Sequence, residues 1–556
     1  MNKQKLTSNL YPCLEGSGVM QALLGAALLC MQGVVVAAQP ETDYPTYSGV
    51  SDASAVLAPP EQTPLIVDLA EMETPDYFKD LLAAKPKRLT SPLFQAGISP
   101  LTATPPSVYA TLGLNLLGTG TGFPGFSMTG EPSDVNGSVG ATQYVQWVNS
   151  QFTVFNKATG ATVLGPLNGN QLFAGLPSDS ICRTTNSGDP VAQYDKLAKR
   201  WVLTQFAITA GVNGQYGQCI AVSQTSDATG AWNVYQYTFT DFPDYPKLSI
   251  WPDGYYITYN MFSHLPGNAY LYAKTCAYDR AAMLAGNPVA TSICFNVPNN
   301  YSLLPSDLDG TTPPPTGAPN PQFEIGADFN GTSLWRYLFH VDFATPANST
   351  LTGPTVIPVT PWTFTCSDTG GPCVTQPVTF QTLDTLGDRL MHRVAYRNFG
   401  SRDSVTISHS VDTGNASHTT GVRWYEIRSP LAAIPIVYQQ ATLAPDTDHR
   451  WMPSVAMDKA GNILIGYSRS SLTTYPSIYY TGRLRSEPRG YLEGERQIVG
   501  GTGYQQGHGR WGDYSSMSVD PVDDCTFWYT QQYTDSPSGD FIWKTRVANA
   551  KFPNCQ

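Results

Sequence analysis

Seven aspartates recur at similar places along the chain, and they are the first candidates for chemistry. An aspartate can serve as a general acid or base, and its oxygens suit a hard cation such as Ca²⁺. The recurring residues are Asp134, Asp189, Asp244, Asp307, Asp388, Asp448 and Asp513. Asp134 and Asp189 are candidate catalytic residues, and the other five could hold a calcium ion. The repetition itself favours a structural role, because an aspartate carboxylate also accepts backbone N–H groups and sets turns.

Arginines are concentrated near the later aspartates. Arg393, Arg450 and Arg510 could hold a carboxylate or sulfate group through planar, bidentate hydrogen bonds. The alternative is that each arginine pairs with an aspartate of the repeat to satisfy its burial.

Tyrosine and histidine side chains add candidates for proton transfer. Tyr514 follows an aspartate directly and is a candidate nucleophile or proton donor. His508, like His392 and His449, could abstract a proton next to a uronate carboxylate. The set predicts a site for an acidic sugar and, if it is catalytic, a glycoside hydrolase or a polysaccharide lyase.

A repeated hairpin must position these side chains. Each recurring aspartate precedes a short apolar strand, a tight turn and an aromatic strand, as in residues 189–206 and 244–259. The markers are 55 to 81 residues apart, and the better copies contain four strands. Seven such units predict an all-β, seven-bladed β-propeller in which the starts of the innermost strands converge on one end of a central channel. A second set of aspartates, Asp195, Asp253, Asp458 and Asp520, is expected to set the turn after the first strand.

Some parts of the repeat are irregular. The last unit lacks one strand, and we expect residues 110–117 to supply it, so that strands from both termini close the ring. The fourth and fifth units are less regular, and the Pro-rich residues 311–321 predict an inserted loop.

Composition excludes several classes of protein. The chain has 556 residues, 32 Lys+Arg and 43 Asp+Glu, for a formal net charge of −11. So acidic a chain with so few cations is a poor partner for nucleic acid, whose affinity depends on phosphate contacts. A content of 41% hydrophobic and 12% aromatic residues predicts a large core and excludes disorder over most of the length.

The N-terminal region has the pattern of an export signal. Lys3 and Lys5 precede an apolar stretch that ends at Ala38, so residues 1–38 are interpreted as a signal peptide, with an uncleaved membrane anchor as the alternative. Residues 39–109 form a Pro/Ser/Thr-rich leader with one short helix expected within 69–82, and residues 110–556 form the propeller. No further segment is long and apolar enough to span a membrane, so we expect a secreted, periplasmic or cell-surface protein.

Eight cysteines follow the signal, an even number that suits disulfides in an oxidising compartment. Their order suggests that neighbouring cysteines pair within one structural unit. The expected pairs are Cys182–Cys219, Cys276–Cys294, Cys366–Cys373 and Cys525–Cys555. Zinc binding is the alternative, but the chain has no CxxC motif and its seven histidines are dispersed.

Long segments of the chain resemble a widespread set of secreted bacterial proteins. They include SDVNGSVGATQYVQWVNSQFTVFNKATG (133–160), GDPVAQYDKLAKRWVLTQFA (188–207) and RWGDYSSMSVDPVDDCTFWYT (510–530), and the resemblance covers about residues 115–555. The set is similar in fold to the sialidase-like propellers, and the resemblance assigns no activity. Tyrosine often stands in the set where this chain has His392 and His449.

These observations lead to two functional expectations. The first is a secreted propeller that binds an extracellular acidic carbohydrate at the channel mouth and, if it is an enzyme, also cleaves it. This protein is expected to be a monomer. The second is a non-catalytic adhesion or matrix protein that uses the propeller as an interaction platform for an extracellular glycan or surface polymer.

Overall fold

Antiparallel β-sheet dominates the structure. The computed structural model describes residues 132–209, 214–265, 269–326, 331–366, 372–535, 537 and 542–556, together with four short strands earlier in the chain. The predicted signal peptide and the helix expected within 69–82 lie outside the described residues. No helix in the described part of the chain is long and apolar enough to cross a membrane.

The first three sheets follow the predicted hairpins closely. They are, in chain order, β5 (Asn136–Val139), β6 (Gln143–Val148), β7 (Gln151–Asn156) and β8 (Thr162–Asn168); β9 (Val191–Asp195), β10 (Arg200–Ile208), β11 (Tyr216–Ser223) and β12 (Ala231–Phe239); and β13 (Phe242–Ile250), β14 (Gly254–Phe262), β15 (Tyr270–Asp279) and β16 (Ser292–Val297). Short helices connect some strands: η3 (Gly169–Phe173), α2 (Ile181–Thr184) and α3 (Arg280–Leu284). Each sheet is a meander of sequential antiparallel strands.

The fourth and fifth units share one nine-stranded sheet. Its strands are β17 (Leu304–Asp309), β18 (Asn320–Ile325), β19 (Ser333–His340), β20 (Thr350–Pro358), β21 (Val394–Asn398), β22 (Asp403–Asp412), β23 (Thr420–Arg428) and β24 (Ile436–Leu443), with β1 (Thr46–Ser48) beside β20 and η4 (Pro346–Asn348) before it. The sheet is continuous because β17 pairs in parallel with β21, from Ser306 with Val394 to Asp309 with Arg397. The fourth and fifth units are therefore joined along their first strands. The Pro-rich residues 311–321 mostly form the expected loop, which ends where β18 begins.

The last two sheets complete the described chain. They contain β25 (His449–Met457), β26 (Ile463–Ser470), β27 (Ser477–Arg483) and β28 (Arg496–Val499), and then β29 (Ser516–Val519), β30 (Phe527–Thr534) and β31 (Ile542–Ala550). The strands that pair with β31 are β3 (Phe123–Pro124) and β4 (Met128–Thr129). The pairing segment thus comes later in the chain than the expected 110–117, which lies outside the described residues.

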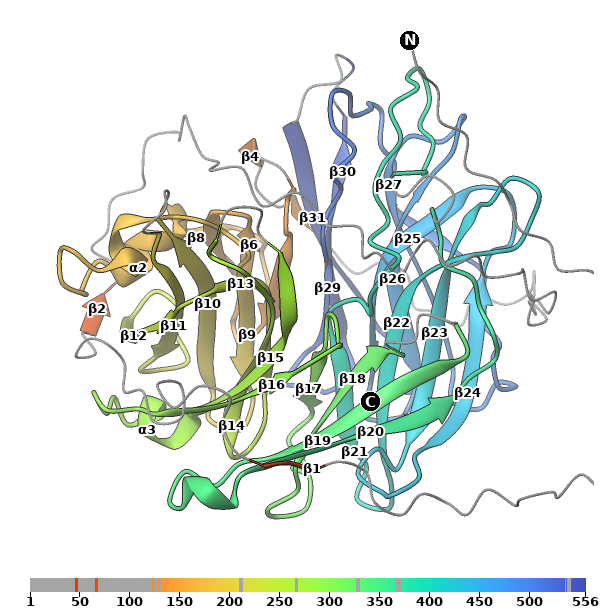
Figure 1. Ribbon diagram of the computed structural model, residues 1–556. Helices are drawn as coiled ribbons and strands as arrows, with labels where there is room; N and C mark the ends of the chain where they lie inside the picture. The colour runs from red at the N-terminus through yellow and green to blue at the C-terminus, as the bar shows by residue number, and fades with distance from the viewer. Residues whose placement is uncertain are drawn as a thin grey trace, which may run out of the picture. The chain divides into compact units, whose positions relative to one another are not determined.

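The first strands of the units contact one another in a cycle. In the described part of the chain β5 contacts β9, β9 contacts β13, β13 contacts β17, β17 pairs with β21, β21 contacts β25, β25 contacts β29, and β29 contacts β5. In Figure 1, β9, β17 and β29 lie near the middle of this body, with β12 and β24 on opposite sides. The starts of these strands are therefore brought near one another.

Hydrophobic residues fill the space between neighbouring sheets. One cluster joins Val191 and Ile220 of the second sheet to Leu248 and Ile257 of the third, and full burial of such side chains contributes about 1.5–3 kcal/mol each. The fit is close where β26 meets β30, because a Cβ on Gly466 would lie 2.4 Å from the Tyr529 ring. Any larger residue at Gly466 would push the two sheets apart.

Turn chemistry and disulfides fix the ends of the strands. Asp195 Oδ1 accepts hydrogen bonds from Leu197 N and Ala198 N, and Asp458 Oδ1 does so from Ala460 N and Asn462 N, which confirms the predicted turn role. The four expected disulfides are all present: Cys182–Cys219, Cys276–Cys294, Cys366–Cys373 and Cys525–Cys555.

Two short strands from the predicted leader add to the outer edges of sheets. β1 pairs with β20, and β2 (Ile66–Asp68) pairs with β12. Each covers a strand edge that would otherwise present unpaired backbone groups.

Candidate functional site

The segments that start β5, β9, β13 and β29 meet at one end of the cycle. Tyr514 O–H donates to Pro190 O at 2.9 Å, and Tyr245 O–H donates to Asp513 O at 3.1 Å. Asp134 N donates to the backbone of the β29 segment at 2.8 Å. We call the charged and aromatic residues here the mouth cluster: Asp134, Asp189, Tyr245, Lys247, Arg389, Arg510, Asp513 and Tyr514. The structure therefore brings together several residues that the sequence singled out.

The backbone of the mouth cluster is held in an uncommon conformation. Asp134, Asp189, Tyr245 and Asp513 have φ values of 45°, 48°, 56° and 64°. Residues other than glycine seldom adopt this left-handed region, and each such residue costs of order 1–3 kcal/mol. Its recurrence at the starts of four strands shows that the repeat imposes one backbone geometry here.

Lys247 lies at the centre of the cluster, buried between two aromatic rings. Its Nζ is 3.4 Å from the centre of the Tyr245 ring and 4.0 Å from that of Tyr514, and it donates to Pro246 O at 3.0 Å. Burial lowers the pKa of Lys247 to about 7, although the charges of Asp189 and two other aspartates oppose the shift. This amine can therefore gain or lose a proton near neutral pH.

Arg389 brings a second buried cation to the cluster. Its guanidinium carbon lies 4.5 Å from the centre of the Tyr245 ring and 4.9 Å from that of Tyr301. Its Nε donates to Asp388 Oδ1 at 3.0 Å. Asp388, one of the five aspartates suggested for calcium, thus neutralises an arginine.

Arg510 is the partly exposed cation of the cluster. It forms an ion pair with Asp513, and 31% of its side chain remains accessible. Its Nε has no hydrogen-bond partner among the described residues. Gln505 holds this loop by donating to His508 O at 2.9 Å and to Arg510 O at 2.7 Å. The exposed His508 therefore lies on the same held loop as Arg510.

Tyr514 and His392 are buried behind Arg510. Burial raises the pKa of Tyr514 well above its usual value, and the charges of Asp134 and Asp189 raise it further. Because its O–H is also donated to a backbone carbonyl, Tyr514 stays protonated in this arrangement. Burial and the charge of Lys247 lower the pKa of His392, so this imidazole is neutral.

Arg393 lies in a different group of ion pairs. Its Nη1 is 3.0 Å from Asp307 Oδ2, its Nη2 is 2.6 Å from Asp309 Oδ2, and its Nε donates to Met517 O at 2.9 Å. Lys196 Nζ is 3.1 Å from the other oxygen of Asp309. These contacts use all three guanidinium nitrogens inside the protein and give Arg393 a structural role.

Arg450 forms a third group within its own unit. Its guanidinium pairs with Asp446 at 2.7 Å and with Glu495 at 2.6 Å, and burial with neighbouring charge lowers the pKa of the adjacent His449 to about 4. Asp448 is 2.9 Å from Arg469. The three arginines suggested for substrate binding are thus held in three separate ion-pair groups.

Four of the five aspartates suggested for calcium take part in these or similar ion pairs. Asp307, Asp388, Asp448 and Asp513 each form an ion pair with an arginine, and the described residues contain no group of three or more His, Cys, Asp or Glu side chains placed to hold a metal. Calcium binding by these residues and Asp244 stays a prediction. Arg389 and Arg510 are chain neighbours of the aspartates that they pair with, whereas Arg393 lies 86 positions from Asp307.

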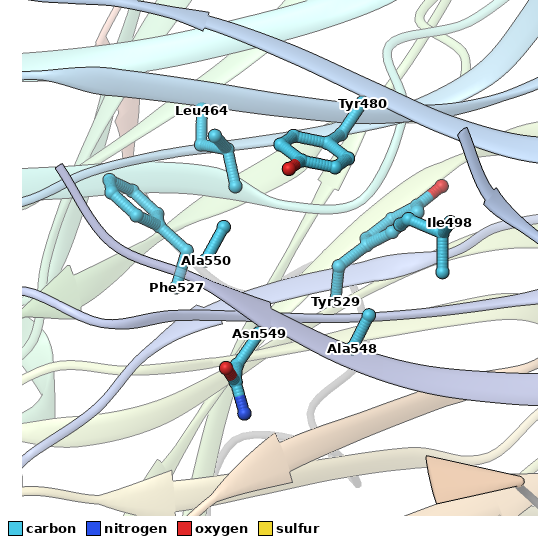
Figure 2. Close-up of a pocket in the computed structure, with 8 residues that line it drawn as sticks. All are labelled: Leu464, Tyr480, Ile498, Phe527, Tyr529, Ala548, Asn549 and Ala550. Atoms are coloured by element: carbon cyan, nitrogen blue, oxygen red, sulfur yellow. The ribbon is translucent and has the colours of Figure 1, made fainter. Parts of the chain in front are cut away.

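A small apolar cavity lies elsewhere, between the last two sheets. It has a volume of about 10 Å³, room for one water molecule at most. Its walls in Figure 2 come from β26, β27, β28, β30 and β31 and consist of Leu464, Tyr480, Ile498, Phe527, Tyr529, Ala548, Asn549 and Ala550. None of the candidate residues lines this cavity, so it has no part in the site.

Sequence reasoning missed the part that Lys247, Tyr245 and Tyr301 play at the mouth. The available signal was the run Asp244-Tyr245-Pro246-Lys247 within the inner strand β13. In the structure the pairing of β13 with β14 shifts register between Asp244 and Lys247, and this irregularity accompanies the placement of Lys247 at the mouth.

Comparison with known proteins gives resemblances of fold only. No family model and no curated protein matches the chain. Among solved structures it is similar to an ulvan lyase of a polysaccharide lyase family, with 10% identity, coverage of 75% of this chain and 93% of the other, and a TM-score of 0.34. It is also similar to an endo-arabinase from Bacteroides thetaiotaomicron, with 13% identity, coverage of 55% and 95%, and a TM-score of 0.26. A third similar structure is a Hadza microbial sialidase, with 10% identity, coverage of 75% of each chain and a TM-score of 0.33. At these values the function of the chain has to be argued from its own residues.

Proposed function

We propose that the described sheets form a seven-bladed β-propeller, in which each predicted unit is one blade. The closed cycle of contacts among β5, β9, β13, β17, β21, β25 and β29 supports this architecture. The pairing of β31 with β3 and β4 supports closure of the last blade by strands from both ends of the chain. Removal of residues 39–131 should then lower the melting temperature, whereas removal of residues 39–45 should not.

We propose further that the protein is exported and that its mouth cluster binds an acidic extracellular carbohydrate. The observation that carries this proposal is the state of Arg510. Of the three candidate arginines it alone is substantially exposed, with 31% of its side chain accessible against 2% for Arg393 and 0% for Arg450. A carboxylate or sulfate group can accept hydrogen bonds from Arg510 without breaking a buried ion pair.

The neighbouring groups set the character of this site. Arg389 adds a second buried cation to the cluster, and Lys247, with a pKa of about 7, is a cation only in part at neutral pH. Asp388 and Asp513 are engaged with arginines, while Asp134 also acts on Arg510 and raises its pKa.

Catalysis is the second part of the proposal, and its chemistry is elimination. Arg510 would neutralise a uronate carboxylate, and His508 on the same loop would take the C5 proton next to it. The C4–C5 double bond forms as the glycosidic C4–O bond breaks, and the departing oxygen takes a proton from water. Tyr514, Asp134 and Asp189 then hold the cluster together. The buried, protonated state of Tyr514 supports this division of roles over a nucleophilic tyrosine.

The test uses short uronate oligosaccharides and three variants. Arg510→Gln should weaken binding roughly tenfold or more, because it removes a charged hydrogen bond, with little change in melting temperature. His508→Ala should retain binding and remove any release of unsaturated ends, which is followed by ultraviolet absorbance. Arg450→Met should lower stability and leave binding unchanged.

The alternative, a non-catalytic adhesion or matrix protein, predicts a different result. Binding that depends on Arg510 without any product from a panel of anionic polysaccharides would establish it. Equal binding by the wild type and Arg510→Gln would contradict the assignment of the site.

A further inference from the structure

Five arginines gather at the other end of the sheets from the mouth cluster. β21 begins beside Arg393 and ends at Asn398, so the loop that follows lies at the far end of the inner strand. Arg428 on β23 lies opposite Ser404 on β22, close to this loop. With Tyr438 on β24, we call four of them the arginine patch: Arg402, Arg428, Arg485 and Arg489. The fifth, Arg483, is buried beside them and donates to Glu487 O and Pro488 O.

Contacts with aromatic rings and glycine fix the positions of these arginines. The ring of Tyr438 packs against two guanidinium groups, with its centre 3.1 Å from Arg428 Cζ and 4.0 Å from Arg489 Cζ. Gly461, in the turn between β25 and β26, lies beside two more. A Cβ at this position would be 3.0 Å from Arg485 Cδ and 3.2 Å from Arg402 Nη2. The patch therefore joins two neighbouring units in one ordered surface.

Positive charge on this surface exceeds negative charge. Glu426 pairs with Arg428 at 2.7 Å, and Glu487 accepts a hydrogen bond from Leu484 N at 2.7 Å. Burial and the charges of Arg485 and Arg428 lower the pKa of Arg402.

Arg402 is only partly exposed. Its Nε is buried without a hydrogen-bond partner among the described residues, and its guanidinium carbon lies 4.0 Å from the centre of the Phe399 ring. In a chain with a net charge of −11, such a gathering of like charges raises the free energy of the unliganded protein. A bound anion would relieve this repulsion.

We propose that the arginine patch binds a polysaccharide that carries closely spaced sulfate or carboxylate groups. Arginine suits this ligand, because its planar fork makes two parallel hydrogen bonds to either anion. The proposal does not rest on the function of the mouth cluster, since the two sets of residues lie at opposite ends of the strands and share no member.

The experiment compares two variants with the same change in charge. Arg485→Gln/Arg489→Gln removes two exposed cations of the patch. Lys199→Gln/Arg200→Gln is the control matched in charge, because it removes two cations where β9 turns into β10, at the same end of the strands in another unit. The probes are heparin, polygalacturonate, neutral dextran and phosphatidylglycerol vesicles, with affinity measured at several salt concentrations.

The wild type should bind heparin or polygalacturonate and not dextran, and which of the two it prefers identifies the anionic group. The patch variant should bind roughly tenfold more weakly and with a smaller dependence on salt, while the control should differ by less than twofold. An equal loss in both variants, or no binding of either polyanion, would overturn the proposal. So would binding to the vesicles alone.

Arg510→Gln separates the two proposed sites. It should leave binding of the polymer by the patch unchanged, and a loss as large as that of the patch variant would place the polymer at the mouth instead. Failure of the mouth cluster to bind short uronates would leave the patch result standing.

Discussion

Arg393→Met tests whether the buried ion-pair group is a structural centre. The substitution removes the guanidinium that contacts Asp307 at 3.0 Å and Asp309 at 2.6 Å, and both carboxylates are about 1% exposed. Lys196, at 3.1 Å from Asp309, is then the remaining cation in the group. Breaking a buried pair by removing one partner costs about 3–5 kcal/mol, so we expect a loss of that size in the free energy of unfolding at pH 7.

The loss should depend on pH in a defined direction. In the wild type, burial opposes ionisation of Asp309, but Arg393, Lys196 and Arg397 hold its pKa below the usual value. Its stabilising contribution is therefore present above the unfolded pKa of about 4 and is lost as the pH falls. In Arg393→Met, burial should raise the folded pKa of both aspartates. Protonation at low pH then removes the cost of the unpaired buried charges in the variant. The difference between variant and wild type should shrink from pH 7 to pH 4.5.

The assay is guanidinium chloride unfolding followed by tryptophan fluorescence at the two pH values. Arg469→Met is the control, because its guanidinium is 20% exposed, and it should cost about 1 kcal/mol or less. Arg393→Met/Asp307→Asn removes one of the unpaired charges and should recover part of the loss, which keeps the test decisive if the single variant folds poorly. A loss below about 1 kcal/mol for Arg393→Met, or a loss that grows as the pH falls, would refute the reasoning.

Three further predictions concern the mouth cluster, the disulfides and the sheet contacts. Lys247 has a folded pKa of about 7 against about 10.4 in the unfolded chain. The stability of the wild type relative to Lys247→Met, measured by urea unfolding, should therefore rise between pH 7 and pH 9. A stability difference that does not change with pH would contradict the lowered pKa. Replacing Cys182 and Cys219 by serine, which opens a separation of 37 residues, should cost about 4 kcal/mol, and the same change at Cys366 and Cys373, separated by 7, about 2 kcal/mol; the opposite order of melting temperatures would rule out the chain-entropy explanation. Gly466→Val should destabilise the protein by at least about 1–3 kcal/mol, because Tyr529 leaves no room for a side chain. If the double variant Tyr529→Ala/Gly466→Val loses less stability than the two single variants added together, the two residues are in contact.

Local features of the fold could be predicted from the sequence, because they depend on residues close together in the chain. The turn at Asp195 is set by hydrogen bonds to residues two and three positions later. The disulfides join neighbouring cysteines, and Cys276–Cys294 lies directly across β15 and β16. Alternating aromatic and β-branched residues were enough to place most hairpins.

Long-range features could not be predicted in this way. The parallel pairing of Asp307 with Ala395 joins residues separated by two irregular connections, and no local pattern indicates it. The sequence allowed each arginine to pair with an aspartate of the repeat, but it could not name Asp307, 86 positions away, as the partner of Arg393. The arginine patch was missed for the same reason, since Arg402 and Arg485 come together only when two units pack side by side.

The arginines of this chain differ in whether their guanidinium groups are already paired inside the protein, and this difference decides which of them could bind a ligand. Arg393 and Arg450 have their guanidinium nitrogens committed to buried acceptors, so a ligand could reach them only by breaking contacts that cost several kcal/mol. Arg510 keeps 31% of its side chain accessible, and the arginine patch includes the exposed Arg485 and Arg489. A ligand gains most where cations remain accessible, and these two places, at opposite ends of the strands, are where anionic groups should be sought.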